Sequence, residues 1–157
     1  MSTICVEIET IYSNDALYLI EQLSSTLAKR YEQDTDEGKA AFELSDMDMP
    51  GAAFVVARLD GQPIGCGAIR PFDEESVAEV KRMFVVPTMR GRGISKQILA
   101  KLEDTARSLG YTTTVLETGT RQPEAMALYE KTGYKRCHCW GKYVNSSWSI
   151  CYRRELA

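Results

Sequence analysis

Residues 77–109 constrain the possible fold more than any other part of this 157-residue chain. Residues 77–86 are rich in β-branched and apolar side chains, which is typical of a buried strand. Pro87 cannot donate to a β-ladder and ends that strand. A basic, glycine-containing loop follows at residues 90–96 and leads into a segment with helical periodicity. The stretch therefore predicts a strand, a tight loop and a helix, in that order.

The predicted helix has recognisable ends and one apolar stripe. Ser95 is a suitable N-cap, and Gly110 is expected just past the C-terminal end. Glu103 and Arg107 are spaced to pair on the outer side. The stripe consists of Ile98, Leu99, Leu102, Ala106 and Leu109.

The loop has the chemistry of an anion site. Gly91 and Gly93 lack a Cβ, so the backbone there can bend sharply and approach a ligand closely. The helix that follows offers free N–H groups and a positive dipole end. Arg90, Arg92 and Lys96 add positive charge at the same place. A phosphate, and most naturally a pyrophosphate, suits this loop.

Other interpretations of the loop stay open at this point. It is alternatively a surface turn with incidental arginines. A dinucleotide fingerprint, Gly-x-Gly-x-x-Gly, would need glycine where Lys96 stands, with Glu117 as the acid that binds the ribose. A P-loop is excluded, because no Gly-Lys-Ser/Thr sequence closes the turn.

Two motifs carry a resemblance to a known family. The loop, Arg90-x-x-Gly93-x-Ser95, resembles the Gln/Arg-x-x-Gly-x-Gly/Ala loop with which GCN5-related N-acetyltransferases (GNAT) bind the pyrophosphate of acetyl-CoA. Ser95 departs from the last position but is small. Residues 118–134, which end in Leu-Tyr-Glu-Lys-Thr-Gly-Tyr, resemble the second GNAT signature, and within them Gln122 stands where many members carry asparagine. Together, at this spacing, the motifs identify the chain as a GNAT member.

The order of the expected elements is similar to that family over nearly the whole chain. An Asp60-Gly61 turn predicts a hairpin. Strands are expected at 5–8, 53–59, 64–69, 77–86, 112–117, 134–140 and 148–153, and helices at 14–31, 39–44, 95–109 and 122–132. The resemblance implies an α/β (α+β) acyl-CoA N-acyltransferase fold in one domain spanning 1–157. Its sheet would be mixed and mostly antiparallel, with a central parallel strand pair, and flanked by helices.

Composition sets the remaining bounds. With 44% apolar and 26% charged residues, the chain is typical of a globular domain, and no apolar run is long enough to span a membrane. A net charge of −3 disfavours a nucleic-acid partner. The first residues do not form a signal peptide, and five scattered cysteines do not predict a disulfide framework, so a cytoplasmic location is expected. Cys137-His138-Cys139 lacks the spacing and the further ligands of a structural zinc site, so no metal is predicted. We expect a monomer or homodimer.

The resemblance also assigns a binding site for acetyl-CoA as cosubstrate. The backbone of Met83, Phe84 and Val85 would contact the pantetheine arm and the acetyl carbonyl. Gln122 would add a contact at the start of the last helix. The pyrophosphate would be bound by Arg90, Gly91, Arg92, Gly93, Ile94, Ser95 and Lys96.

Two residues are candidates for proton transfer. Glu79 precedes the pantetheine segment and matches the glutamate that serves as general base in some GNAT members; alternatively it is an acid paired with Lys81 or Arg82. Tyr129 matches the family tyrosine near the cofactor sulfur and would protonate the departing thiolate; alternatively it is a core aromatic residue.

These residues predict an enzyme that transfers acetyl to a primary amine of a small molecule or peptide by direct attack. The alternative is a catalytically silent acyl-CoA-binding sensor or scaffold. The acidic segment 32–48 suggests a cationic acceptor.

Overall fold

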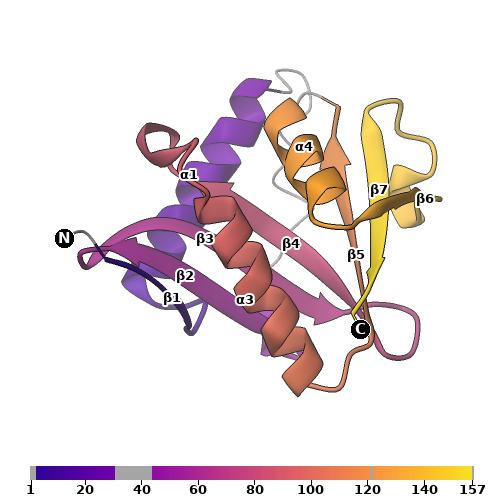
Figure 1. The fold of residues 1–157 in the computed structure, drawn as a ribbon, viewed down its shortest axis with the longest axis horizontal. Helices are drawn as coiled ribbons and strands as arrows, with labels where there is room; N and C mark the ends of the chain where they lie inside the picture. Colours follow the sequence, from indigo (N-terminus) through magenta and orange to yellow (C-terminus); the bar gives the residue numbers. More distant parts are fainter. Residues whose placement is uncertain (1–2, 31–43, 121, 157) are drawn as a thin grey trace.

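The computed structural model describes residues 3–30, 44–120 and 122–156. Figure 1 shows one sheet with helices on both of its faces. The strands are β1 (Ile4–Ile8), β2 (Ala53–Leu59), β3 (Gln62–Pro71), β4 (Val77–Val85), β5 (Thr113–Gly119), β6 (Lys135–Cys137) and β7 (Ser149–Glu155). The α-helices are α1 (Asn14–Arg30), α3 (Ile94–Ser108) and α4 (Pro123–Lys131), with 3₁₀ turns η1 (Leu44–Asp48), η2 (Pro87–Met89) and η3 (Gly141–Tyr143). The expected helix at 39–44 falls outside the described residues except for Leu44, which begins η1. No helix in the described ranges is long and apolar enough to cross a membrane.

The sheet has the expected mixed topology. Its strand order is β1-β2-β3-β4-β5-β7-β6, and only the β4–β5 pair is parallel. Asp60 and Gly61 both have positive φ, as a tight hairpin turn between β2 and β3 requires. The predicted GNAT fold, with its central parallel pair, is confirmed.

The parallel pair separates part of the way along its length. β4 pairs with β5 only from Val77↔Thr113 to Val80↔Leu116, although β4 continues to Val85 and β5 to Gly119. A β-bulge lies just past this point: Arg82 has φ 59°, and β4 has one residue more than β3 between the pairs Cys66↔Phe84 and Ala68↔Lys81. Figure 1 shows the two strands diverging upward. A wedge-shaped gap between two strand ends is thereby built into the sheet.

Both faces of the sheet are buried, as the alternation along β2 shows. Val55 and Ala57 belong to the core beneath α3, whereas Phe54 and Val56 belong to the core beneath α1. Because successive strand residues point to opposite faces, a continuous apolar run is what a strand covered on both sides needs.

Helix α3 lies close against β3 because β3 presents two glycines to it. A Cβ built on Gly67 would lie 2.7 Å from Leu102 Cδ1 and 2.8 Å from Ile98 Cγ2. A Cβ on Gly65 would lie 2.7 Å from the carbonyl oxygen of Phe84. The glycines therefore set the distance between the helix and the sheet.

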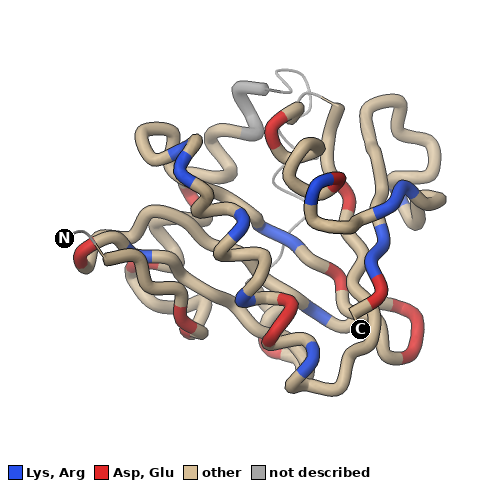
Figure 2. The backbone as a smooth tube through the Cα atoms, viewed as in Figure 1, with Lys and Arg blue, Asp and Glu red and all other residues tan. Residues whose placement is uncertain are grey.

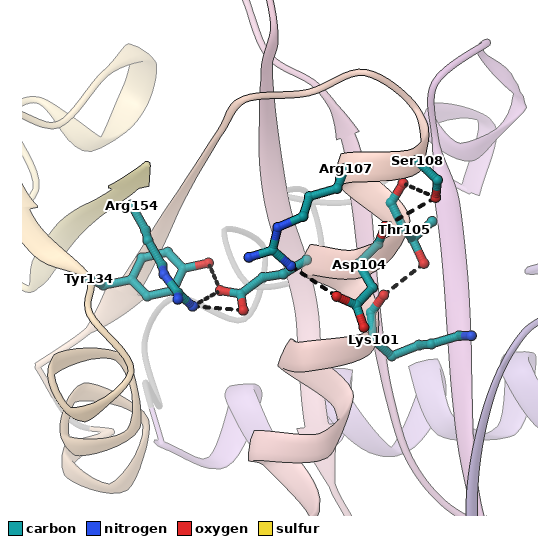
Figure 3. Close-up of polar contacts among 8 residues, drawn as sticks. Lys101, Asp104, Thr105, Arg107, Ser108, Tyr134 and Arg154 are labelled. Carbon is teal, nitrogen blue, oxygen red and sulfur yellow. Dashed lines mark hydrogen bonds and ion pairs between the residues drawn. The ribbon is translucent and has the colours of Figure 1, made fainter. Parts of the chain in front are cut away.

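Several details of α3 differ from the sequence prediction. The helix begins at Ile94 with Gly93 as N-cap in the left-handed region, so Ser95 lies inside the first turn. Leu109 is 49% exposed, because the helix ends at Ser108 and the chain then turns away at Gly110. Arg107 pairs with Asp104, at 2.9 Å, and not with Glu103 (Figure 3).

Glu103 is buried and belongs to a polar network instead. Its carboxylate accepts hydrogen bonds from the Tyr134 hydroxyl at 2.9 Å and from Arg154 Nη1 at 2.8 Å. Figure 3 shows Tyr134 and Arg154 meeting at this face of α3. A buried carboxylate needs such hydrogen-bond partners. The network therefore ties α3 to β7 through Arg154 and to the start of β6 through Tyr134.

The C-terminal region contains a disulfide that the sequence analysis did not predict. Cys139 and Cys151 are bonded, with Cα atoms 5.3 Å apart. The expected strand at 134–140 is reduced to β6, because the chain leaves the sheet after Cys137 and forms η3 before returning as β7. The bond therefore anchors the segment that carries η3 to β7.

Candidate active site

The divergence of β4 and β5 opens a cleft of about 670 Å³. Its walls come from β4, the loop before α3, the end of β5, α4 and η3. Every residue predicted for the site lines this cleft except Arg92: Glu79, Met83, Phe84, Val85, Arg90, Gly91, Gly93, Ile94, Ser95, Lys96, Gln122 and Tyr129. The structure thus brings together residues that lie up to 50 positions apart in the chain (129 − 79 = 50).

The loop end of the cleft has the geometry of an anion site. Gly91 and Gly93 have φ of 79° and 76°, and a Cβ on either would meet nothing within 4 Å. No neighbouring atom of the described residues therefore requires glycine at these two positions. Glycine is instead favoured by the positive φ and by the space it leaves for a ligand. The first N–H groups of α3 have no intrahelical acceptors and point toward this end. Figure 2 shows positively charged segments at the start of α3 and just before it.

Arginine and lysine positions around the loop are not equivalent. Arg90 lines the cleft and is held by a 3.0 Å hydrogen bond from its Nε to the carbonyl of Val85. Lys96 lines the cleft from the first turn of α3. Arg92 is exposed and is not part of the lining, so its charge acts from outside the cleft.

The strand wall exposes backbone to the cleft. Phe84 and Val85 bury their side chains in the two cores, while β4 beyond Val80 has no pairing with β5. The edge of β4 that faces the cleft can therefore pair with an extended ligand, as an additional strand would. Gln122, the N-cap of α4, lies across the cleft from it.

Glu79 lies at the closed end of the cleft, where β4 and β5 are still paired. It is only 4% exposed. Arg70 Nε donates to its Oε1 at 3.1 Å, and Lys81 Nζ lies 3.9 Å from its Oε2. The sequence analysis named Lys81 or Arg82 as the ion-pair partner, and the structure has the pair with Lys81. Arg70 from β3, which was not considered, lies closer to Glu79. Glu79 is thus both an ion-pair residue and a cleft residue.

Tyr129 is a core aromatic residue that also lines the cleft. Its side chain is 5% exposed, and its ring packs 5.7 Å from that of Tyr134 and 5.9 Å from that of Tyr152. Burial, with the nearby Glu117 carboxylate and Tyr152, raises the pKa of Tyr129 well above its usual value. The hydroxyl therefore holds its proton over the whole physiological pH range, as a proton donor must.

Glu117 is a cleft residue that the sequence analysis considered only as a ribose ligand. It accepts a 2.7 Å hydrogen bond from Ser149 Oγ, and burial raises its pKa, while Lys81 and Lys142 act in the opposite direction. Its position follows from the register of β5 with β7, where Glu117 pairs with Cys151. The pairing register of β5 and β7 cannot be read from a local sequence pattern. The sequence analysis therefore placed Glu117 on a strand but did not place it in the cleft.

The site therefore offers a loop with the geometry of an anion site, an unpaired strand edge, a buried carboxylate and a protonated tyrosine. These are the parts required to bind an acyl-CoA and to move protons around its thioester.

Comparison with known proteins agrees with this description. A model of the acetyltransferase (GNAT) family matches residues 15–134. A protein of Azospirillum brasilense named IAA acetyltransferase is 36% identical over 156 residues, which covers 99% of this chain and 100% of that protein. A Klebsiella pneumoniae structure, assigned as an acyl-CoA N-acyltransferase, superposes with a TM-score of 0.81 at 27% identity and covers 99% of both chains.

A third similar structure contains the cosubstrate. It is a GNAT family acetyltransferase from Elizabethkingia anophelis with acetyl-CoA bound; it covers 98% of both chains, with a TM-score of 0.68 and 19% identity, and so shows likeness of fold. On the family match and the full-length relative, this chain belongs to the acetyltransferase (GNAT) family, whose enzymes take their acetyl group from acetyl-CoA.

Proposed function

We propose that the enzyme transfers the acetyl group of acetyl-CoA to the primary amine of a small molecule or peptide, by direct attack of the amine on the thioester. The observation that carries the proposal is the single cleft that Glu79, Tyr129 and the residue 90–96 loop all line. A shared cleft allows amine, thioester and pyrophosphate to be held together, which converts a bimolecular step into an oriented one.

The chain's own residues have distinct roles in this scheme. The loop and the first turn of α3 bind the pyrophosphate, and the edge of β4 at residues 83–85 binds the pantetheine arm and polarises the acetyl carbonyl. Glu79 takes the proton from the attacking ammonium group, directly or through water. Tyr129 gives a proton to the leaving thiolate. Because a thiol has a pKa of about 8.5, that thiolate leaves fairly well without help.

Release of the CoA thiol in the presence of a panel of amines tests the proposal. We expect turnover with at least one class of primary amine and slow background hydrolysis without it. Calorimetry should show binding of acetyl-CoA that weakens as salt is raised, since charged groups meet phosphates. Free CoA should compete and NAD should not. Binding of acetyl-CoA without turnover of any amine would favour the silent binding module.

A further inference from the structure

A second pocket, of about 450 Å³, adjoins the closed end of the cleft. We call it the acceptor pocket. The two cavities share Glu79, Lys81, Lys142 and Tyr143. A molecule in the acceptor pocket can therefore reach Glu79, the proposed base, from the side opposite to the pyrophosphate loop.

The acceptor pocket is rich in positive charge. Arg70, Lys81 and Lys142 line it, against the carboxylates of Glu79 and Asp73. Glu79 is already engaged by Arg70 at 3.1 Å and by Lys81 at 3.9 Å. Figure 2 shows positive and negative segments following each other along β4 in this region. The arrangement places a carboxylate directly beside an excess of cations.

The remaining walls are aromatic. Phe72 and Trp140 meet edge to face with ring centres 4.9 Å apart, and Tyr143 lies 6.3 Å from Trp140. Lys81 Nζ lies 3.4 Å from the Tyr143 hydroxyl, and Lys142 Nζ lies 5.7 Å from the centre of the Tyr143 ring. Lys81, whose side chain is 10% exposed, has lost part of its hydration, so it attracts a bound anion more strongly, whereas Lys142 is exposed and acts from the rim of the pocket.

We infer that the acceptor is an α-amino acid with an apolar or aromatic side group, and this inference rests on the proposed function. An α-amino acid carries its amine and its carboxylate on one carbon, and the pocket holds Glu79 and Lys81 at comparably short range. The amine faces Glu79, the carboxylate faces Lys81 and Lys142, and the side group packs on Phe72, Trp140 and Tyr143. A polyamine would bring further positive charge to a pocket that already has an excess of it. The cationic acceptor suggested by segment 32–48, most of which lies outside the described residues, is therefore disfavoured.

Matched acceptor pairs test the inference directly. The members of each pair differ in structure only by the carboxylate: tryptophan with tryptamine, phenylalanine with phenethylamine, leucine with isopentylamine. Because the carboxylate also lowers the pKa of the amine, kcat/KM is calculated on the concentration of free-base amine. We expect kcat/KM to be about 10-fold or more higher for the amino acid, as one charged hydrogen bond is worth. Equal or better turnover of the amines lacking the carboxylate would overturn the inference and leave the proposed function intact.

A variant series locates the carboxylate site. Lys142→Met should raise KM for the amino acid about 10-fold with kcat and the KM for acetyl-CoA unchanged, and Lys142→Arg should restore most of the loss. Lys135→Met, on β6 and outside both cavities, is the matched control. An unchanged KM in Lys142→Met would count against the assignment.

Binding separates failure of the inference from failure of the proposed function. Titration of the enzyme saturated with free CoA with phenylalanine needs no turnover. Binding that Lys142→Met weakens, together with no acetyl transfer to any amine, would support the pocket and overturn the proposed function. Turnover of amines without binding of any amino acid would support the proposed function and overturn the inference about the acceptor pocket.

Discussion

The two halves of the site, the cleft around the pyrophosphate loop and the acceptor pocket that adjoins it, are built in different ways. The half around the pyrophosphate loop, which we call the cosubstrate half, comes mainly from one continuous stretch, from β4 through the loop to α3. The half around the acceptor pocket, the acceptor half, is assembled from β3 and the loop after it, β4 and η3, which are brought together by strand register and a disulfide. The geometry of a continuous strand–loop–helix unit is specified largely by neighbouring residues, whereas that of the acceptor half depends on elements far apart in the chain. The first suits a cosubstrate shared by a family, and the second suits an acceptor that differs among its members.

The largest expected effect tests whether Glu79 acts as the general base for the acceptor amine. Glu79→Gln keeps the shape and the contact with Arg70 but removes the base. We expect kcat/KM near neutral pH to fall about 10²–10⁴-fold, with acetyl-CoA affinity unchanged. The loss should shrink as pH rises, because more of the amine is then already deprotonated.

The control for Glu79→Gln is Glu103→Gln, at a glutamate that is 5% exposed and lies outside the cleft. It should lower the melting temperature but leave the pH–rate profile in place. If Glu79→Gln also leaves the profile unaltered, Glu79 is a structural ion-pair residue and water or the free-base amine carries the proton.

The next effect concerns Tyr129, which lines the cleft from α4. Tyr129→Phe keeps the ring packing and removes the proton, so kcat should fall about 100-fold, at the low end for a positioned acid. Since the pKa of Tyr129 is raised, its ionisation should not limit activity below about pH 10. An alkaline limb below that pH that disappears in Tyr129→Phe would contradict the assignment.

Tyr134→Phe is the matched control for Tyr129→Phe, because its ring packs in the same cluster while its hydroxyl bonds to Glu103. It should cost about 1 kcal/mol of stability and leave kcat intact.

The third effect should be confined to the cosubstrate half. Gly93→Val places a branched side chain at φ 76°, next to the proposed pyrophosphate site, and should weaken acetyl-CoA binding on the order of 10–100-fold by loss of charged hydrogen bonds. Gly61→Val introduces the same side chain at φ 87° in the β2–β3 turn, also with nothing within 4 Å. Calorimetry should show reduced affinity only for Gly93→Val. An equal loss in both variants would assign the effect to backbone strain.

The smallest effect should be confined to the acceptor half. Cys139→Ser removes the bond that anchors the segment carrying Trp140 and Tyr143. We expect KM for the acceptor to rise a few-fold, roughly the cost of one poorly positioned side chain, without change in acetyl-CoA affinity. Cys5→Ser, at an exposed free cysteine on β1, is the control. A matching change in acetyl-CoA affinity would show that the halves are not independent.

The sequence predicted the cosubstrate half well because its signals are local. A strand pattern, a proline stop, glycines in a basic loop and a helical stripe lie within one stretch, and the structure has these elements nearly where expected. The error at Glu103 arose because a charged residue beside an apolar stripe was taken to face solvent, when its partners Tyr134 and Arg154 come from elements far along the chain.

The acceptor half could not be predicted in the same way. Arg70 meets Glu79 through the antiparallel register of β3 and β4, and Glu117 meets Ser149 through that of β5 and β7. The disulfide depends on how far the chain travels between β6 and β7. Register over such separations is set by tertiary packing, and no short pattern in one sequence specifies it.

The glycine face of β3 makes the position of the anion site adjustable from a distance. Gly65 lies beneath Ile98, and Gly67 lies beneath Ile98 and Leu102, so the two missing Cβ atoms allow α3 to sit close to β3. A substitution such as Gly67→Ala would lift the middle of α3, whose first turn is the proposed phosphate site, and it would press on Met83 in the strand wall, whose sulfur lies 3.0 Å from the added atom. One methyl group outside the loop would thus act on the proposed pyrophosphate site through α3 and on the proposed pantetheine site through Met83. Fine adjustment of cosubstrate affinity is thus available to this fold without altering a residue of the loop itself.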